Sequence, residues 1–201
     1  MKLFYKAGAC SLAPHIVARE AAIDLDVIQV DLATKKTEHG EDYLATNPNG
    51  YVPALVLEGG ELLTESQVLV QYLADLKPES GLMPKAGEMD RYQAQRWLAF
   101  ISSELHKTYG PLFRPDTPEA TKDANRAHIA KRLAYVDASL EGKSYLLGDR
   151  FTAADAYLWT VLGWSGRVGV DLSAYANVNR FIKTVAGRPA VQAALKAEGL
   201  V

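Results

Sequence analysis

The sequence predicts a small α/β domain followed by a larger all-helical domain. Up to about residue 76 short apolar stretches typical of strands alternate with two helical segments, a cluster of proline, serine and glycine follows at residues 77–81, and beyond it helix follows helix. We therefore expect domains at residues 1–77 and 88–201, joined by a linker at residues 78–87. A chain of 201 residues is long enough to form two hydrophobic cores.

The elements follow from local patterns. In the first domain we expect strands at residues 2–5, 27–31, 54–57 and 61–63, helices at residues 11–22 and 66–76, and a polar loop after residue 31. The turn EGGE at residues 58–61 favours a tight hairpin, because adjacent glycines accept the positive φ that such turns require. Helical spacing recurs at residues 92–105, 127–140, 154–162 and 178–186. Thr152 and Asp155 have capping-box spacing, which assigns Asp155 a structural role instead of a catalytic one.

Composition excludes several classes of partner. The formal charge is -2 and the pI is near 6.1, so we expect neither nucleic acid nor an anionic membrane surface as a partner. No apolar run approaches the length of a membrane span, and the N-terminus lacks the pattern of a secretory signal. A single unpaired cysteine is typical of a reducing compartment, so we expect a cytoplasmic protein, and we expect no bound metal.

Cys10 is the only cysteine and stands between a predicted strand and a predicted helix. Amide groups and the dipole at the start of a helix stabilise a thiolate, so this position favours a lowered pKa. Without a second cysteine, any sulfur bond must involve a soluble thiol, a partner chain or an electrophile. The alternative is that Cys10 is a small buried hydrophobic residue, as free cysteines often are.

Two further segments suit a bound peptide. If the Val52–Pro53 bond is cis, the backbone groups of Val52 face outward and can pair with a peptide as an extra strand. The alternative is a trans proline at the first residue of a strand. Glu65 and Ser66 stand at the start of a predicted helix, where Ser66 can hold a carboxylate and Glu65 an ammonium group. Ordinary helix capping is the alternative there.

Several ordered motifs together resemble those of the cytosolic glutathione transferases, most closely the bacterial beta class. They are KLFY at residues 2–5, GACS at 8–11, NPNGYVPAL at 47–55, LTES at 63–66, ELHK at 104–107 and FTAAD at 151–155. The resemblance covers essentially the whole chain. It implies a thioredoxin-like N-terminal domain with a cis-proline, an all-helical C-terminal domain and a homodimer.

The resemblance also implies roles for matching residues. Cys10 would face the glutathione sulfur, Val52, beside Pro53, would bond the cysteinyl backbone, and Glu65 and Ser66 would hold the γ-glutamyl end. The glutathione site would thus be built mainly from the first domain.

From the helical domain, His106 and Lys107 would reach the same sulfur. A positive charge there would favour a thiolate, because opposite charge at short range lowers a thiol pKa. Alternatively, His106 is a half-buried helical histidine and Lys107 a solvated surface charge. Lys35 would meet the glycine carboxylate of glutathione, although residues 35–36 also suit a solvated loop.

Some positions depart from the family pattern or share a role. Ala7 stands where relatives often carry proline and Ala99 where many carry asparagine, so glutathione affinity is expected to be lower. Tyr5 or Ser11 can share or replace the role of Cys10, since other transferase classes use an N-terminal tyrosine or serine hydroxyl, though core packing is the better interpretation of Tyr5. Residues that can line an apolar electrophile pocket, or equally the core, are Tyr109, Phe113 and Trp164.

Three functions remain open from the sequence. The first is an enzyme that conjugates the glutathione thiolate to small hydrophobic electrophiles, such as an activated aryl halide. The second is a redox cycle in which Cys10 forms a mixed disulfide with glutathione that a second glutathione resolves. The third is a non-catalytic module that uses the same fold to bind a ligand or a protein.

Overall fold

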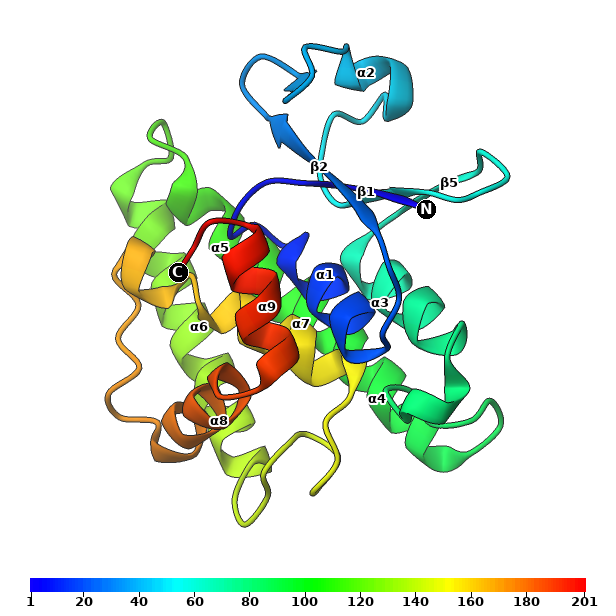
Figure 1. Cartoon of the computed structure of the whole chain (residues 1–201). Helices are drawn as coiled ribbons and strands as arrows, with labels where there is room; N and C mark the ends of the chain where they lie inside the picture. The colour runs from blue at the N-terminus through cyan, green and yellow to red at the C-terminus, as the bar shows by residue number, and fades with distance from the viewer. The chain divides into compact units, whose positions relative to one another are not determined.

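The computed structural model describes residues 1–201, which pack into two compact units (Figure 1). The first unit contains Met1–Met83 and Gly187–Val201, and the second contains Pro84–Ala186. The boundaries expected from the sequence, at residues 77 and 88, stay a prediction. Packing nevertheless assigns the C-terminal residues to the first unit, because α9 (Pro189–Ala197) lies against α1 (Leu12–Glu20).

The first unit is built on a five-stranded sheet with the order β3-β2-β1-β4-β5. Its strands are β1 (Lys2–Tyr5), β2 (Asp26–Asp31), β3 (Lys36–Thr37), β4 (Ala54–Val56) and β5 (Leu62–Thr64). β1 pairs with β2 in parallel, and the other pairs are antiparallel. The helices are α1, α2 (Tyr43–Thr46), α3 (Ser66–Asp75) and α9. β3 and α2 lie in the segment expected to be a polar loop, since elements this short carry no periodic signal.

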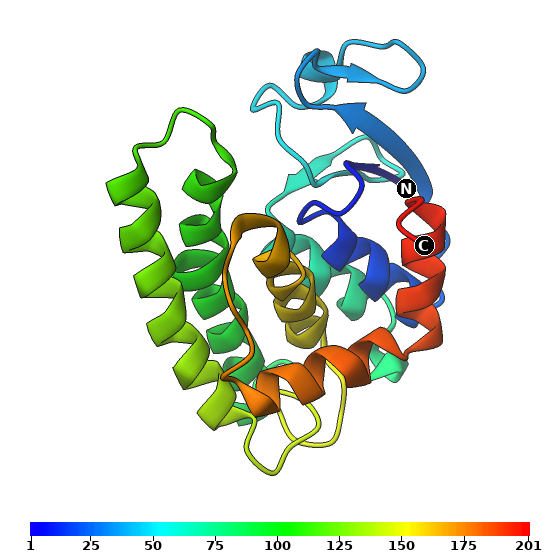
Figure 2. The same cartoon turned by 90° about the vertical axis from the view of Figure 1, so that its left-hand side faces the viewer.

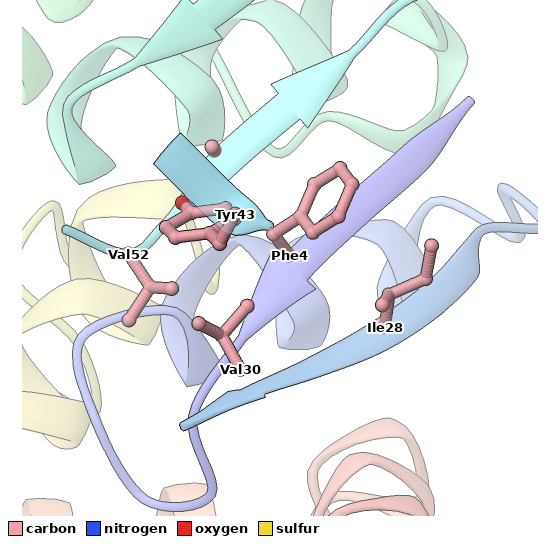
Figure 3. Packing of buried hydrophobic residues seen from close by; sticks show 6 residues of the cluster. Phe4, Ile28, Val30, Tyr43 and Val52 are labelled. Carbon is pink, nitrogen blue, oxygen red and sulfur yellow. The ribbon is translucent and has the colours of Figure 1, made fainter. Parts of the chain in front are cut away.

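Alternation along the strands gives the sheet two apolar faces. In register, Phe4 pairs with Ile28 on one neighbour and with Ala54 on the other. These three residues pack with Val30, Tyr43 and Val52 into one buried cluster (Figure 3). Leu3 points to the opposite face because successive side chains of a strand alternate. Figure 2 shows α1 and α3 on one side of the sheet and α2 on the other.

The expected hairpin is present between β4 and β5. Gly60 has φ +93°, and the Leu57 N–H donates to the Glu61 carbonyl at 2.9 Å. A residue with a side chain is strained at such a φ, so glycine at this position closes the turn and sets the register that leads into α3.

The second unit is all-helical, as expected. It contains α4 (Met89–Phe100), α5 (Lys107–Tyr109), α6 (Glu119–Ser139), α7 (Ala153–Leu162) and α8 (Ala176–Ala186), with a π-helical turn at Ile101–His106 between α4 and α5. α7 contacts α4 and α8 and is buried along nearly its whole length. α6 begins earlier than the expected residue 127, because its first turns are polar and carry no apolar spacing.

The capping box at the start of α7 is confirmed. The Asp155 carboxylate accepts the Thr152 N–H and hydroxyl at 2.8 and 2.7 Å, and its other oxygen accepts the Leu146 N–H at 2.8 Å. Asp155 is completely buried, so its charge serves this hydrogen-bond network. Among the helices of the chain, none combines the length and the apolar character that crossing a membrane would need.

Candidate functional site

Cys10 lies in the turn between β1 and α1, directly before the helix begins. The turn is closed by the Ala9 N–H, which donates to the Lys6 carbonyl at 2.9 Å, and the Leu12 N–H donates to the Ala9 carbonyl at 3.0 Å. The Cys10 thiol donates to the carbonyl of Val52 at 3.2 Å. The fold therefore joins two segments that are 42 residues apart and that the sequence analysis named separately.

The Cys10 thiol is not activated in this chain, which corrects the lowered pKa expected from its place before a helix. Burial raises its pKa to about 11. Hydrogen bonds from the Ser66 hydroxyl and from the Cys10 and Ser11 N–H groups oppose this rise, and the charge of Glu65 adds to it. Part of the residue remains exposed, yet Ser11, Val52 and Ser66 around it are buried, so desolvation of the thiolate outweighs the helix start.

Ser11 and Tyr5 are both engaged in contacts within the first unit. The Ser11 hydroxyl accepts the Lys6 N–H and donates to the Lys6 carbonyl, both at 3.2 Å, so it is engaged within the turn. Tyr5 is buried in the core, and burial, with the charges of Glu198 and Glu38, raises the pKa of its phenol. The core-packing interpretation of Tyr5 fits this placement.

The Val52–Pro53 bond is cis. Two buried side chains fix the segment that leads into it: the Tyr43 hydroxyl and the Asn47 amide donate to the Tyr51 carbonyl at 2.6 and 2.8 Å. Figure 3 shows Tyr43 and Val52 close together on the same face of the sheet. The Val52 N–H donates to no group of the chain. The edge expected to bond a peptide thus offers one unused donor.

Lys35 is held against this segment and is not a solvated loop residue. Its Nζ donates to the Gly50 carbonyl at 2.8 Å and lies 5.5 Å from the centre of the Tyr51 ring. Lys35 itself has φ +57°, an uncommon conformation for a residue with a side chain. The ammonium group retains further donors beside residues 47–53.

Glu65 and Ser66 lie at the start of α3. Glu65 is exposed and has φ +68°, which turns the chain sharply into the helix. The buried Ser66 hydroxyl donates to the Cys10 carbonyl at 3.3 Å. The N–H groups of Ser66 and Gln67 donate to no group of the chain, so the helix start can accept an anion. Cys10, Val52 and Ser66 are therefore joined by direct hydrogen bonds.

In the second unit, His106 ends the π-helical turn. Its Nδ1 lies 2.6 Å from the Tyr157 hydroxyl, and its ring packs edge-on against Trp164 with the centroids 4.9 Å apart. Burial lowers the pKa of His106 to about 4. His106 is therefore neutral near pH 7 and supplies no positive charge, which corrects the protonated form considered from the sequence. Lys107, the next residue, is exposed.

Trp164 gathers the aromatic residues expected to line an apolar pocket. Its ring contacts those of Tyr109 and Phe113, with centroids 5.9 and 6.0 Å apart. Tyr109 is completely buried and its hydroxyl lies 2.7 Å from that of Ser165, so it belongs to the core. Phe113 is exposed and is the better candidate for contact with a ligand.

Sequence reasoning missed the residues that support the site. Tyr43 lies in the segment taken for a polar loop, and Asn47 was only part of a motif. His15 and Glu198 form a buried pair with 3.0 Å between Nδ1 and Oε1, across 183 residues of sequence. The tyrosine that precedes residues 47–50 could have indicated a side chain that supports this segment. No local pattern links His15 to Glu198.

The first unit is a mixed sheet with a cysteine before its first helix, and this cysteine lies beside a cis-proline and the open start of α3. A helical unit follows. Together these features define a thioredoxin-like protein with a site for a thiol peptide. Residues 7–76 match the N-terminal domain of glutathione S-transferases, and residues 100–189 match their C-terminal domain. The chain belongs to the glutathione S-transferase family.

Similar proteins agree with this assignment. The chain is 50% identical over 200 residues to glutathione S-transferase GstA of Escherichia coli O157:H7, and the match covers all of both chains. A sphingomonad glutathione S-transferase solved in complex with glutathione is 48% identical with a TM-score of 0.96, and the beta-class enzyme of Sphingomonas chungbukensis is 47% identical with a TM-score of 0.96. Both structures match over 100% of each chain. The resemblance to beta-class transferases, the fold class and glutathione as co-substrate are confirmed.

Proposed function

We propose that the protein conjugates the glutathione thiolate to small hydrophobic electrophiles and that Cys10, Lys35, Val52, Pro53, Glu65 and Ser66 hold the glutathione. The observation that carries this proposal is a pair of hydrogen bonds at Cys10: its thiol donates to the Val52 carbonyl, and its backbone carbonyl accepts the Ser66 hydroxyl. These groups come from three segments, and each suits a different part of a thiol tripeptide.

The binding mode follows from the unused groups. The Val52 N–H is free to pair with the cysteinyl backbone of glutathione, while the Val52 carbonyl can exchange the Cys10 thiol for a peptide N–H. The open N–H groups at the start of α3 suit the γ-glutamyl carboxylate, and Glu65 suits its ammonium group. Lys35, held at Gly50, suits the glycine carboxylate.

The chemistry assigns Cys10 a donor role. With a pKa of about 11, its S–H remains protonated and can donate a hydrogen bond to the glutathione thiolate. We assign His106, through the ring nitrogen that does not face Tyr157, and the cation Lys107 to stabilising the same thiolate. In the reaction, glutathione releases its thiol proton to solvent, a carbon–sulfur bond forms, and the electrophile loses its halide.

Cys10 as the redox nucleophile is the less supported form of this function, because the thiolate is the attacking species and burial disfavours it. The variant Cys10→Ala distinguishes conjugation from the redox cycle. Conjugation is expected to persist within about tenfold, since one weak donor is lost, and thiol–disulfide exchange, if the chain performs it, is expected to disappear. An added glutathione mass on the intact chain that vanishes with reductant would favour the redox cycle instead.

Calorimetric titration of reduced glutathione into the protein tests the proposal. We expect measurable binding, and about tenfold weaker binding in Ser66→Ala, because a buried hydroxyl that meets a carboxylate is lost. Ser139→Ala is the matched control, since the exposed Ser139 hydroxyl also donates to a backbone carbonyl, that of Tyr135 at 2.8 Å. Absence of heat with the wild-type protein would refute the proposed binding, and a non-catalytic module would then be the better interpretation.

We further propose that the protein is a cytoplasmic homodimer. Its one cysteine is unpaired, which suits a reducing compartment. In the second unit, α4 exposes 69% of Met89 and 57% of Tyr92, apolar surface that a second copy can cover. Light scattering on the purified protein tests the dimer, and a mass of 21.9 kDa at working concentration would exclude it.

A further inference from the structure

An exposed aromatic ring and an unpaired cation lie together in the second unit. Phe113 ends a short helical turn at Gly110–Phe113, and Arg167 lies in another short helical turn at Ser165–Val168. The guanidinium carbon of Arg167 is 5.9 Å from the centre of the Phe113 ring. Both side chains are exposed, and 45% of Phe113 is accessible to solvent. The unit therefore presents an apolar ring and a positive charge side by side.

Contacts with the core hold the two turns next to each other. The Tyr109 hydroxyl lies 2.7 Å from that of Ser165, which connects the start of one turn to the start of the other. The Arg167 N–H donates to the Trp164 carbonyl at 3.0 Å, and the Trp164 ring contacts that of Phe113. Tyr109 and Trp164 are both buried. The position of Arg167 beside Phe113 is therefore fixed by buried neighbours.

The charge of Arg167 is not neutralised within the chain. No carboxylate pairs with Arg167, and its side-chain N–H groups donate to no group of the chain. A guanidinium that lies over a ring keeps its five donors available. The neighbouring Arg126, whose Nε donates to the Val168 carbonyl, instead pairs with Glu119 and Asp123, each at 2.8 Å. Of these two arginines, only Arg167 can offer an unpaired charge to a ligand.

The pair adjoins a residue of the proposed reaction centre. The His106 ring contacts that of Trp164, which in turn contacts that of Phe113. A row of rings therefore leads from His106 to Phe113 and ends at the Arg167 guanidinium. A neutral electrophile would use the rings of this row and leave the guanidinium without a partner. An aromatic ring that carries an anionic group complements both features.

We propose that the electrophile is an aryl carboxylate with a leaving group on its ring, and that Arg167 selects it. The ring packs against Phe113, and the carboxylate accepts two hydrogen bonds from the planar guanidinium. The glutathione sulfur then bonds to a ring carbon, the halide leaves from that carbon, and the carboxylate is unchanged. The inference rests on the proposed function and deepens it, because it names the class of electrophile.

Calorimetric titrations without glutathione test the selection of an anion. The ligands are 3-nitrobenzoate and 3-nitrobenzamide, which share a ring and differ in charge, and neither carries a leaving halide. We expect the wild type to bind the benzoate about fivefold more tightly, the upper end for an ion pair at an exposed site. Arg167→Gln is expected to bind both ligands equally. Its affinity for the benzamide should match that of the wild type, because the Phe113 ring is retained.

Arg150→Gln is the matched control. Arg150 is also an exposed arginine of the second unit without an ion pair, but it lies before α7, whereas Arg167 follows this helix. The variant is expected to keep the fivefold preference of the wild type. The proposal is overturned if the wild type binds the two ligands equally or fails to bind the benzoate. It is also overturned if the preference survives in Arg167→Gln or disappears in both variants.

Turnover with glutathione tests the same selection during the reaction. The substrates are 4-chloro-3-nitrobenzoate and 4-chloro-3-nitrobenzamide. We expect Arg167→Gln to raise KM for the benzoate about fivefold at unchanged kcat, because a contact remote from the reacting carbon stabilises the ground and transition states alike. Both constants for the benzamide should stay within about twofold of wild type. Equal losses for the two substrates would contradict the role of Arg167.

The two assays separate this inference from the proposed function. If the wild type conjugates neither substrate, the proposed conjugation fails. The binding titrations contain no glutathione, so they still decide whether Arg167 selects an aryl carboxylate. If the wild type conjugates the benzamide but binds the benzoate no better, the conjugation stands and the inference about Arg167 fails.

Discussion

The ionisation of Cys10 gives the sharpest test of the site. The pKa of the thiol is about 11 in the folded chain, against an ordinary value of 9.0, because burial disfavours the thiolate. At pH 8 the thiolate is then about 0.1% of the folded molecules and about 10% of the unfolded ones. Unfolding therefore raises the reactive fraction about a hundredfold, and each pKa unit of this difference corresponds to about 1.4 kcal/mol.

The assay compares iodoacetamide alkylation of Cys10 in native protein and in protein unfolded with guanidinium chloride, from pH 7 to the highest pH at which the protein stays folded. We expect the native rate to rise tenfold per pH unit without a plateau up to about pH 10, and the unfolded profile to level off near pH 9. Loss of access in the folded chain adds to the difference, so a hundredfold change is the lower bound. If the native alkylation rate levels off at or below pH 9, the reasoning is refuted, and Cys10 becomes a candidate for a thiolate nucleophile.

Three further predictions concern stability and binding. Asp155→Ala is expected to destabilise the chain by about 3–5 kcal/mol, because the Thr152 and Leu146 N–H groups lose a buried acceptor; thermal unfolding measures this, and a loss as small as that of exposed Asp171→Ala would contradict it. The folded pKa of His106 is lowered to about 4, so its contribution to stability is complete above pH 6.5 and is lost as pH falls through 4, by about 3 kcal/mol in total. Urea titrations of His106→Phe should therefore show a free energy of unfolding that depends less on pH. The same pH dependence as in the wild type would exclude His106 as its cause. Asn47→Ala is expected to weaken glutathione binding about fivefold, because the Tyr51 carbonyl loses the Asn47 donor. Equal affinity of the wild type and the variant in calorimetry would contradict this.

Residues with local signals were predicted well. The turn around Gly60, the capping box of Asp155 and the strand that begins after Pro53 depend on neighbours within a few positions, and the structure has all three. α9 was not expected, since the sequence analysis predicted no element beyond residue 186. Its helix is stabilised by packing against α1, which no local pattern reports.

In the proposed glutathione site, too, the local signals were readable from the sequence and the contacts between segments were not. Ordered motifs were enough to name Cys10, Val52 and Ser66, because each belongs to a segment with its own recognisable residues. Their mutual hydrogen bonds, and the support of Val52 by Tyr43 and Asn47 through Tyr51, join segments that the sequence analysis treated separately.

What the sequence determined by itself is the family, the division into a part with a sheet and an all-helical part, and the residue types of the proposed site. Only the tertiary structure decided how those residues behave: burial outweighs the helix start at Cys10 and keeps His106 neutral. It also brings Glu198, near the last residue, to the turn of Gly8, near the first. The physical reason is that desolvation and long-range hydrogen bonds depend on the neighbours a residue acquires on folding, and those neighbours are distant in the sequence.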